Sequence, residues 1–209
     1  MKSIVGRLCA AAVVLSSLNG CAPLMLGTAV GGAFVVTDRR TSGAQLEDQG
    51  IEIKASNRIR EAVGERGHIN VTSYNRVILL TGEVVSEADR LTIEQVAART
   101  ENVRSVVNEL AVMGSSSLTS RSSDLLVQAK IKATLVDARD LQSNAFKVVV
   151  ERGEVFLMGM VTEREANRAA DLVASVSGVL KVVKVLHIIS EEELIRKMPP
   201  ASPASAAAR

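Results

Sequence analysis

One cysteine of the chain stands in a setting that suits covalent lipid attachment. In the segment Leu18-Asn19-Gly20-Cys21, an apolar residue lies three positions before the cysteine and a small residue lies directly before it. This pattern looks like a bacterial lipobox, in which the cysteine thiolate takes a diacylglyceryl group as a thioether. The small Gly20 gives a peptidase access to the bond before the cysteine. The pattern therefore predicts lipidation of Cys21.

The residues before this cysteine have the character of an export signal. Lys2 and Arg7 supply positive charge, and residues 8–18 form an apolar run that is too short to span a bilayer. We therefore expect residues 1–20 to be removed. The alternative is an ordinary signal peptide in which the cysteine is incidental.

The cysteine usage and the next residue indicate where the mature protein resides. Cys9 lies in the removed segment and Cys21 is capped by lipid, so the mature chain has no disulfide, which suits an oxidising periplasm. In lipoprotein sorting, an Asp after the cysteine retains a protein in the inner membrane, and here Ala22 follows. We therefore expect a lipid anchor in the outer membrane and a chain that faces the periplasm.

The other residues that could do chemistry do not form a catalytic arrangement. His68 and His187 lie beside expected strand ends, and the sequence contains no HExxH, GxSxG, CxxC or Walker motif. Glu163 and Glu165 are two positions apart on an expected helix and point in different directions, which favours solvated residues of a first turn. We expect no enzyme, no metal site and no cofactor.

The charge balance argues against nucleic acid as a partner. Residues 1–20 hold two of the 25 Lys and Arg residues and none of the 23 Asp and Glu residues, so the mature chain has a formal net charge of zero. The chain has no Trp, one Tyr and three Phe, whereas nucleic-acid binding needs a basic stripe and stacking aromatic residues.

From Ile51 the sequence repeats itself at a shift of 76 or 77 residues. Each copy begins with an apolar stripe of helical period, continues with two strands joined by a tight turn, and ends with a capped helix and a β-branched strand. Each unit therefore reads α-β-β-α-β, an α/β (α+β) fold with two helices packed on a small three-stranded sheet. Gly82 and Gly159 lie inside strands, where a glycine usually indicates a bulge or a close backbone approach. We expect them to allow helix packing over the sheet, with a ligand contact as the alternative.

The predicted organisation follows from this repeat. It consists of a signal peptide (1–20), a lipidated tether (21–50), a first domain (51–113), a linker (114–120), a second domain (121–189) and a disordered tail (190–209). The tail starts with a short Glu-rich helical piece.

The repeated unit, with its strand glycine and the later strand VSGVLKV at 176–182, resembles the BON domain. The stretch GEVFLMGMVTEREA at 153–166 is closely similar to dual-BON outer-membrane lipoproteins, and residues 37–40 and 69–72 are similar as well. The resemblance implies a phospholipid-binding protein that supports outer-membrane integrity and gathers at division sites. It also implies that the first helix of the second unit binds anionic phospholipid through an aromatic residue, where this chain has Leu126.

The residues of that helix give the lipid hypothesis a basis of their own. Leu125 and Leu126 could enter the membrane interface while Lys130 and Lys132 reach phosphates. The alternative is that the leucines pack into the core and the lysines are simply solvated. A phospholipid-binding module and a protein scaffold for envelope assembly machinery or peptidoglycan enzymes both remain open.

Overall fold

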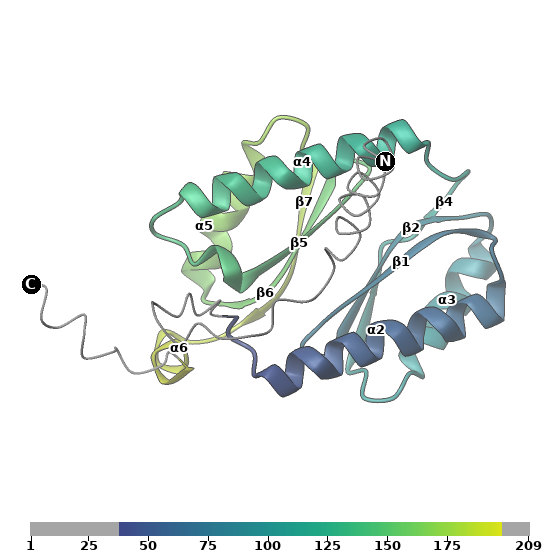
Figure 1. Cartoon of the computed structure of the whole chain (residues 1–209), viewed down its shortest axis with the longest axis horizontal. Helices are drawn as coiled ribbons and strands as arrows, with labels where there is room; N and C mark the ends of the chain where they lie inside the picture. The colour runs from purple at the N-terminus through teal and green to yellow at the C-terminus, as the bar shows by residue number, and fades with distance from the viewer. Residues whose placement is uncertain (1–37, 198–209) are drawn as a thin grey trace, which may run out of the picture. The chain divides into compact units, whose positions relative to one another are not determined.

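The structure is a computed structural model that describes residues 38–197. Its elements, in chain order, are α2 (Ser42–Val63), β1 (Gly67–Tyr74), β2 (Val77–Val84), α3 (Glu87–Ala98), β3 (Ser105–Asn108), β4 (Ala111–Val112), α4 (Leu118–Asp137), a 3₁₀ turn (Ser143–Ala145), β5 (Phe146–Glu151), β6 (Glu154–Val161), α5 (Glu163–Ala174), β7 (Lys181–Ile188) and α6 (Glu191–Lys197). The elements α2 to β4 are called the first repeat and α4 to β7 the second repeat (Figure 1). The mixed α/β fold with two small sheets confirms the fold class expected from the sequence.

The first repeat is a two-layer unit built on its central strand, β2. β1 pairs antiparallel with β2, and β3 and β4 both pair parallel with β2 on its other edge. The helices α2 and α3 cover one face of this sheet (Figure 1). The apolar stripe predicted from the sequence is the buried face of α2, made by Ile51, Ala55, Ile59 and Val63.

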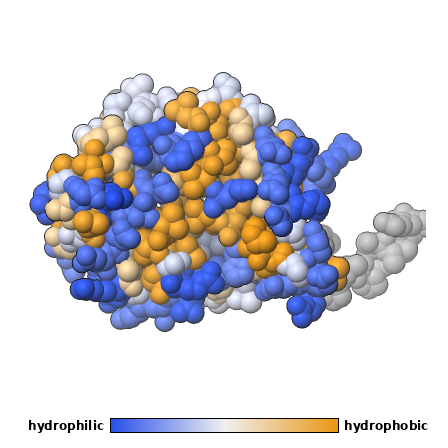
Figure 2. Space-filling view, turned by 180° about the vertical axis from the view of Figure 1, so that it is seen from behind, coloured by the Kyte–Doolittle hydropathy of each residue, from blue (hydrophilic) through white to orange (hydrophobic). Residues whose placement is uncertain are grey.

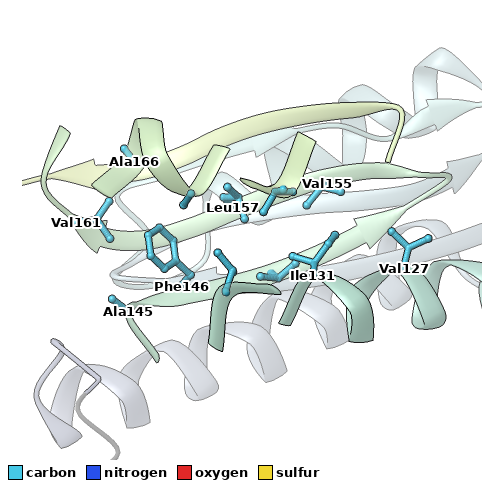
Figure 3. Close-up of a cluster of buried hydrophobic side chains, with 12 residues drawn as sticks. Val127, Ile131, Ala145, Phe146, Val155, Leu157, Val161 and Ala166 are labelled. Atoms are coloured by element: carbon cyan, nitrogen blue, oxygen red, sulfur yellow. The ribbon is translucent and has the colours of Figure 1, made fainter. Parts of the chain in front are cut away.

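The second repeat has the same plan without the interruption in its last strand. The strand order is β5-β6-β7, antiparallel and then parallel. Figure 3 shows Val127 and Ile131 of α4 facing Phe146, Val155 and Leu157 of the sheet. This core uses the face of the sheet that α4 and α5 cover.

The opposite faces of the two sheets bury each other. Tyr74 and Leu79 of the first repeat form one apolar cluster with Phe156, Met158 and Met160 of the second repeat. Sequence periodicity predicts the helix-covered faces. The other face of β6 carries Phe156, Met158 and Met160, which pack in the junction between the repeats. The other face of β2 contributes Leu79 to this cluster and also carries the buried polar residues Thr81 and Glu83.

Several boundaries differ from those expected. α2 begins at Ser42, inside the tether predicted up to residue 50, because Thr41 caps it by accepting a hydrogen bond from the Ala44 N–H. α4 begins at Leu118, inside the predicted linker 114–120. Residues 191–197 of the predicted tail form α6, which confirms the short helical piece; Leu194 on it is buried. Within residues 38–197, no helix has both the length and the apolar character needed to cross a bilayer.

Close backbone approach, and not the expected helix packing, explains why Gly82 and Gly159 stand inside strands. A Cβ on Gly82 would lie 1.9 Å from the carbonyl oxygen of His68, and one on Gly159 would lie 2.4 Å from that of Ala145. Both obstacles are backbone atoms of the strand neighbour or of the turn that leads into it, so glycine is required by close backbone approach within the sheet.

Candidate membrane-contact surface

The four residues predicted to contact lipid all lie on the outer surface of α4. Val127, Ile131 and Leu135 form the buried face of this helix. Leu125 and Leu126 are 66% and 67% exposed, and Lys130 and Lys132 are exposed as well. The alternative in which these leucines pack into the core is therefore wrong.

The structure does not bring these four residues to one point. Successive residues of a helix are about 100° apart, so Leu125 and Lys132 share one side of α4 while Leu126 and Lys130 share the other. Gln128 marks the first side, because its amide donates to the Val148 carbonyl on the outer edge of β5.

The side of α4 that carries Leu125, Gln128 and Lys132 faces the first repeat. Leu125 lines a small hollow of about 210 Å³ together with His68 and Asn70 of β1. Lys132 lines a larger cleft of about 600 Å³ between β1 and β5. Leu126 and Lys130 lie on the opposite side of the helix from this cleft.

An aspartate ties the exposed part of α4 to the turn between β5 and β6. The Asp124 carboxylate accepts hydrogen bonds from the N–H groups of Arg152 and Gly153, both at 2.9 Å. Arg152 has a φ of 52° and Gly153 a φ of 73°, so the turn has the left-handed geometry of a tight hairpin. The start of the helix and this turn therefore form one rigid end of the second repeat.

The first repeat contains the equivalent interaction, in which a helix aspartate binds the backbone of a hairpin turn; we call these two interactions the aspartate latches. Asp48 of α2 accepts from the N–H groups of Asn75 and Arg76 in its own hairpin turn, at 2.7 and 2.8 Å. It also accepts from the Ser73 hydroxyl and from Arg40. Burial alone would raise the pKa of Asp48, but these hydrogen bonds hold it below the ordinary value for an aspartate.

The chain segment before α2 belongs to the junction between the repeats, although sequence patterns assign no role to its side chains. Arg39 donates to both carboxylate oxygens of Glu165 and to the Met160 carbonyl. The expectation of a solvated Glu165 is therefore wrong, because this side chain is buried in a capping box with Thr162 and paired with Arg39. The charged run at 38–40 is the sequence signal for these ion pairs. Nothing in the local sequence shows that the partner of Arg39 is more than a hundred residues away.

Arg40, the next residue of this segment, packs against the only tyrosine. Its guanidinium lies 3.9 Å from the centre of the Tyr74 ring. The Tyr74 hydroxyl accepts from the Met160 N–H of the second repeat, and burial raises the pKa of this phenol to about 12.

The remaining candidates have structural positions. His187 lies 3.2 Å from the Asn75 amide nitrogen across the junction, and His68 pairs with Glu83 in the β1–β2 ladder. Glu163 is exposed at the start of α5. Among residues 38–197, no group of three or more His, Cys, Asp or Glu side chains could hold a metal ion. Cys21, the predicted lipidation site, lies outside the described residues.

Comparison with known proteins gives the class of the chain. The BON domain family matches residues 48–114 and residues 123–190. The chain therefore belongs to the BON-domain family and carries two such domains in tandem.

Two relatives match the chain over most of their length. The chain is 37% identical over 175 residues to the outer membrane lipoprotein DolP of Haemophilus influenzae, a match that covers 82% of this chain and 90% of that protein. It is 31% identical over 154 residues to the 21 kDa hemolysin of Actinobacillus pleuropneumoniae, covering 73% and 79% of the two chains. A solved structure of CdsD, a structural protein of the type III secretion system of Chlamydia trachomatis, is similar at 12% identity and a TM-score of 0.27, covering 69% of this chain and 99% of that one, which is too low to support a conclusion.

Proposed function

We propose that this protein is an outer-membrane lipoprotein, anchored through Cys21 and facing the periplasm, that binds anionic phospholipid with its second BON domain and so supports outer-membrane integrity. The name of the Haemophilus relative and the lipobox support the location. The resemblance to dual-BON lipoproteins extends the proposal to action at division sites.

The observation that carries the lipid-binding part is the exposure of Leu126. Leu126 is 67% exposed, and the opposite face of its helix is buried. Its side chain is therefore left out of the hydrophobic core of the folded chain. Lys130 lies one turn further along the same side, where its ammonium group can reach phosphates while the leucine enters the interface. An apolar tip beside a cation suits an anionic bilayer surface.

Vesicle flotation tests this proposal on the chain from Ala22 to Arg209, which lacks the lipid but keeps every described residue. We expect flotation with vesicles that contain phosphatidylglycerol, little flotation with phosphatidylcholine alone, and weaker binding at high salt because salt screens the lysines. Equal binding to both vesicles, or none to either, would rule out an anionic lipid site.

The lipid anchor has its own test. Replacing Cys21 with Ser should abolish lipid attachment and leave the precursor uncleaved, as read by mass spectrometry of the mature N-terminus. A mature N-terminus at another, unmodified residue would contradict the predicted anchor.

A protein scaffold for envelope assembly machinery or peptidoglycan enzymes is the second candidate, and a different surface favours it. β7 is an edge strand of eight residues, and its Ile188 is 51% exposed. Figure 2 shows a broad apolar area on the face opposite to that of Figure 1, between hydrophilic margins. Edge strands can pair with extended segments of partner proteins. Crosslinking from position 188 in intact cells would distinguish this candidate, because a lipid-only function gives no protein adduct there.

A further inference from the structure

A third exposed leucine lies beside α4 but comes from a distant part of the sequence. Leu180, in the loop between α5 and β7, is 80% exposed, more than either Leu125 or Leu126. It follows Val179, which is partly buried against the core of the second repeat. The loop therefore has its apolar anchor in Val179, and the fold does not bury Leu180.

The loop that carries Leu180 is fixed to both α4 and the β5–β6 turn. A Cβ on Gly178 would lie 2.7 Å from the Val127 side chain, so the loop backbone packs directly against the helix. The Leu180 N–H donates to the Gly153 carbonyl at 2.9 Å. Gly153 is in turn bound by Asp124 of α4.

These contacts place the loop on a defined side of the helix. Val127 is the residue it touches, and Leu126 directly precedes Val127 in the helix. Gln128 occupies the opposite side of Val127, where it binds the edge of β5. Leu126 is therefore the exposed leucine that turns toward the loop, and Leu125 is the one that lines the small hollow beside β1.

The first repeat shows that the fold does not require leucine at these positions. At the same shift of 76 residues, Gly50 stands in place of Leu126 and Arg104 in place of Leu180. The local structure is the same, because the Arg104 N–H donates to the Arg76 carbonyl just as the Leu180 N–H donates to Gly153. The same backbone arrangement thus carries exposed leucines, here called apolar tips, at positions 126 and 180 of the second repeat, and none at the matching positions of the first.

We propose that Leu180 is a second membrane-inserting side chain, which acts with Leu126 to seat the second BON domain on an anionic phospholipid surface. This inference rests on the proposed lipid binding and names a further contact of that site. Two tips on separate, rigidly joined segments fix the orientation of the domain, whereas a single tip would let it rotate. Lys130, one helical turn from Leu126 on α4, supplies positive charge beside that leucine. Lys181, next to Leu180, is exposed, and its charge is offset by an ion pair with Glu154.

The test measures binding of the chain from Ala22 to Arg209 to vesicles of phosphatidylglycerol and phosphatidylcholine. Leu180→Asn and Leu126→Asn each remove an apolar tip without changing charge, and each should weaken binding about fivefold or more. Leu46→Asn is the matched control, because Leu46 is 70% exposed on α2, the equivalent helix of the first repeat. The control should bind like the unchanged chain.

A second measurement reports insertion directly. The chain from Ala22 on contains no cysteine, so a single Cys introduced at position 180, 126 or 46 can carry an environment-sensitive fluorophore. We expect increased, blue-shifted emission on anionic vesicles from positions 180 and 126 and no change from position 46.

The outcomes separate this inference from the proposed function. Loss of binding in Leu126→Asn together with normal binding and no fluorescence change at position 180 would overturn the role of Leu180 and leave lipid binding in place. No binding by the unchanged chain would overturn both. Unchanged thermal unfolding of Leu180→Asn, expected because the first repeat folds with Arg104 there, shows that a loss of binding is not a loss of structure.

Discussion

Arg39 and Glu165 form a bidentate ion pair that fastens the segment before α2 to the start of α5. Their nitrogen and oxygen atoms lie 2.7 and 2.8 Å apart, and the two side chains are 6% and 5% exposed. Burial alone would raise the pKa of Glu165, but the hydrogen bonds and the charge of Arg39 hold it below the ordinary value for a glutamate. The residues at the entry to the first repeat are thus held by the second repeat.

Replacing Arg39 with Ala should therefore destabilise the whole described unit. It leaves the Glu165 carboxylate buried without its cation, which costs about 3–5 kcal/mol. Urea unfolding measures the loss. Arg164→Ala is the control, because Arg164 pairs with Glu191 at 3.7 Å on the surface and such pairs contribute about 0–1 kcal/mol. Equal effects of the two variants would show that the buried pair does not hold the repeats together.

The two aspartate latches should differ in their contribution to stability. Asp48→Ala leaves two backbone N–H groups and a hydroxyl without their acceptor and removes one of the two carboxylates that Arg40 binds, the other being Asp38. Asp124→Ala leaves only the N–H groups of Arg152 and Gly153 without their acceptor. We expect a loss of about 3–5 kcal/mol for the first variant and about 1–3 kcal/mol for the second. Equilibrium unfolding of both variants decides the order, and a larger loss for Asp124→Ala would contradict it.

The repeat and its periodicities predict the elements because they are local. The stripe at Ile51, Ala55 and Ile59 shows a helix and its buried face, and the capping box at Thr162 and Glu165 shows where α5 begins. The junction between the repeats has no such local signal. Tyr74 and Met160 meet there from strands far apart in the chain, and only the packing of the two sheets brings them together.

The candidate lipid site was predictable in part for the same reason. Leu125 and Leu126 can be named from the sequence because the helix stripe leaves them outside the core. Leu180 cannot, since its position beside α4 depends on the contacts of Gly178 and Gly153 with residues of other elements.

Glu151 should make stability depend on pH in the opposite sense to Glu165. Burial raises the pKa of Glu151, and nearby Glu83 adds to the shift, while the Asn70 amide, His68 and Arg152 oppose it. A raised pKa means that the folded chain holds the proton more tightly, so this group costs stability above its folded pKa and the cost is relieved as pH falls toward the ordinary value of about 4.3.

Comparison with Glu151→Gln isolates this effect. The amide keeps an oxygen that can accept from Asn70 and removes the buried charge. We expect the variant to have the higher melting temperature at pH 7.5 and the difference to shrink as the pH is lowered toward about 4.3. A difference that grows on acidification would show that the carboxylate is stabilised in its charged form.

Gly159→Ala should disrupt the centre of the second sheet. Its new Cβ would meet the Ala145 carbonyl at 2.4 Å, and this backbone atom cannot move without shifting the start of β5. We expect a loss of more than about 3 kcal/mol, as for other severe backbone conflicts. Gly114→Ala is a suitable control, because nothing lies within 4 Å of a Cβ there. A small effect at position 159 would mean that β5 and the turn before it are more adaptable than the structure shows.

The two lysines of α4 should differ in their effect on membrane binding, because they lie on different sides of the helix. Lys130 shares its side with Leu126, whereas Lys132 lines the cleft beside the first repeat. Reversing a charge next to an anionic surface removes one attraction and adds one repulsion, each on the order of 1 kcal/mol. Lys130→Glu should therefore weaken vesicle binding at low salt by about tenfold or more, and Lys132→Glu should weaken it much less.

Both side chains are exposed, so neither change should alter thermal unfolding. The measurement is co-sedimentation with phosphatidylglycerol vesicles at low and high salt, where the difference between the variants should disappear as the charges are screened. Equal losses would mean that the bilayer is reached by the whole outer face of α4, and a larger loss for Lys132→Glu would place the lipid surface at the cleft side, with Leu125 in the role assigned to Leu126.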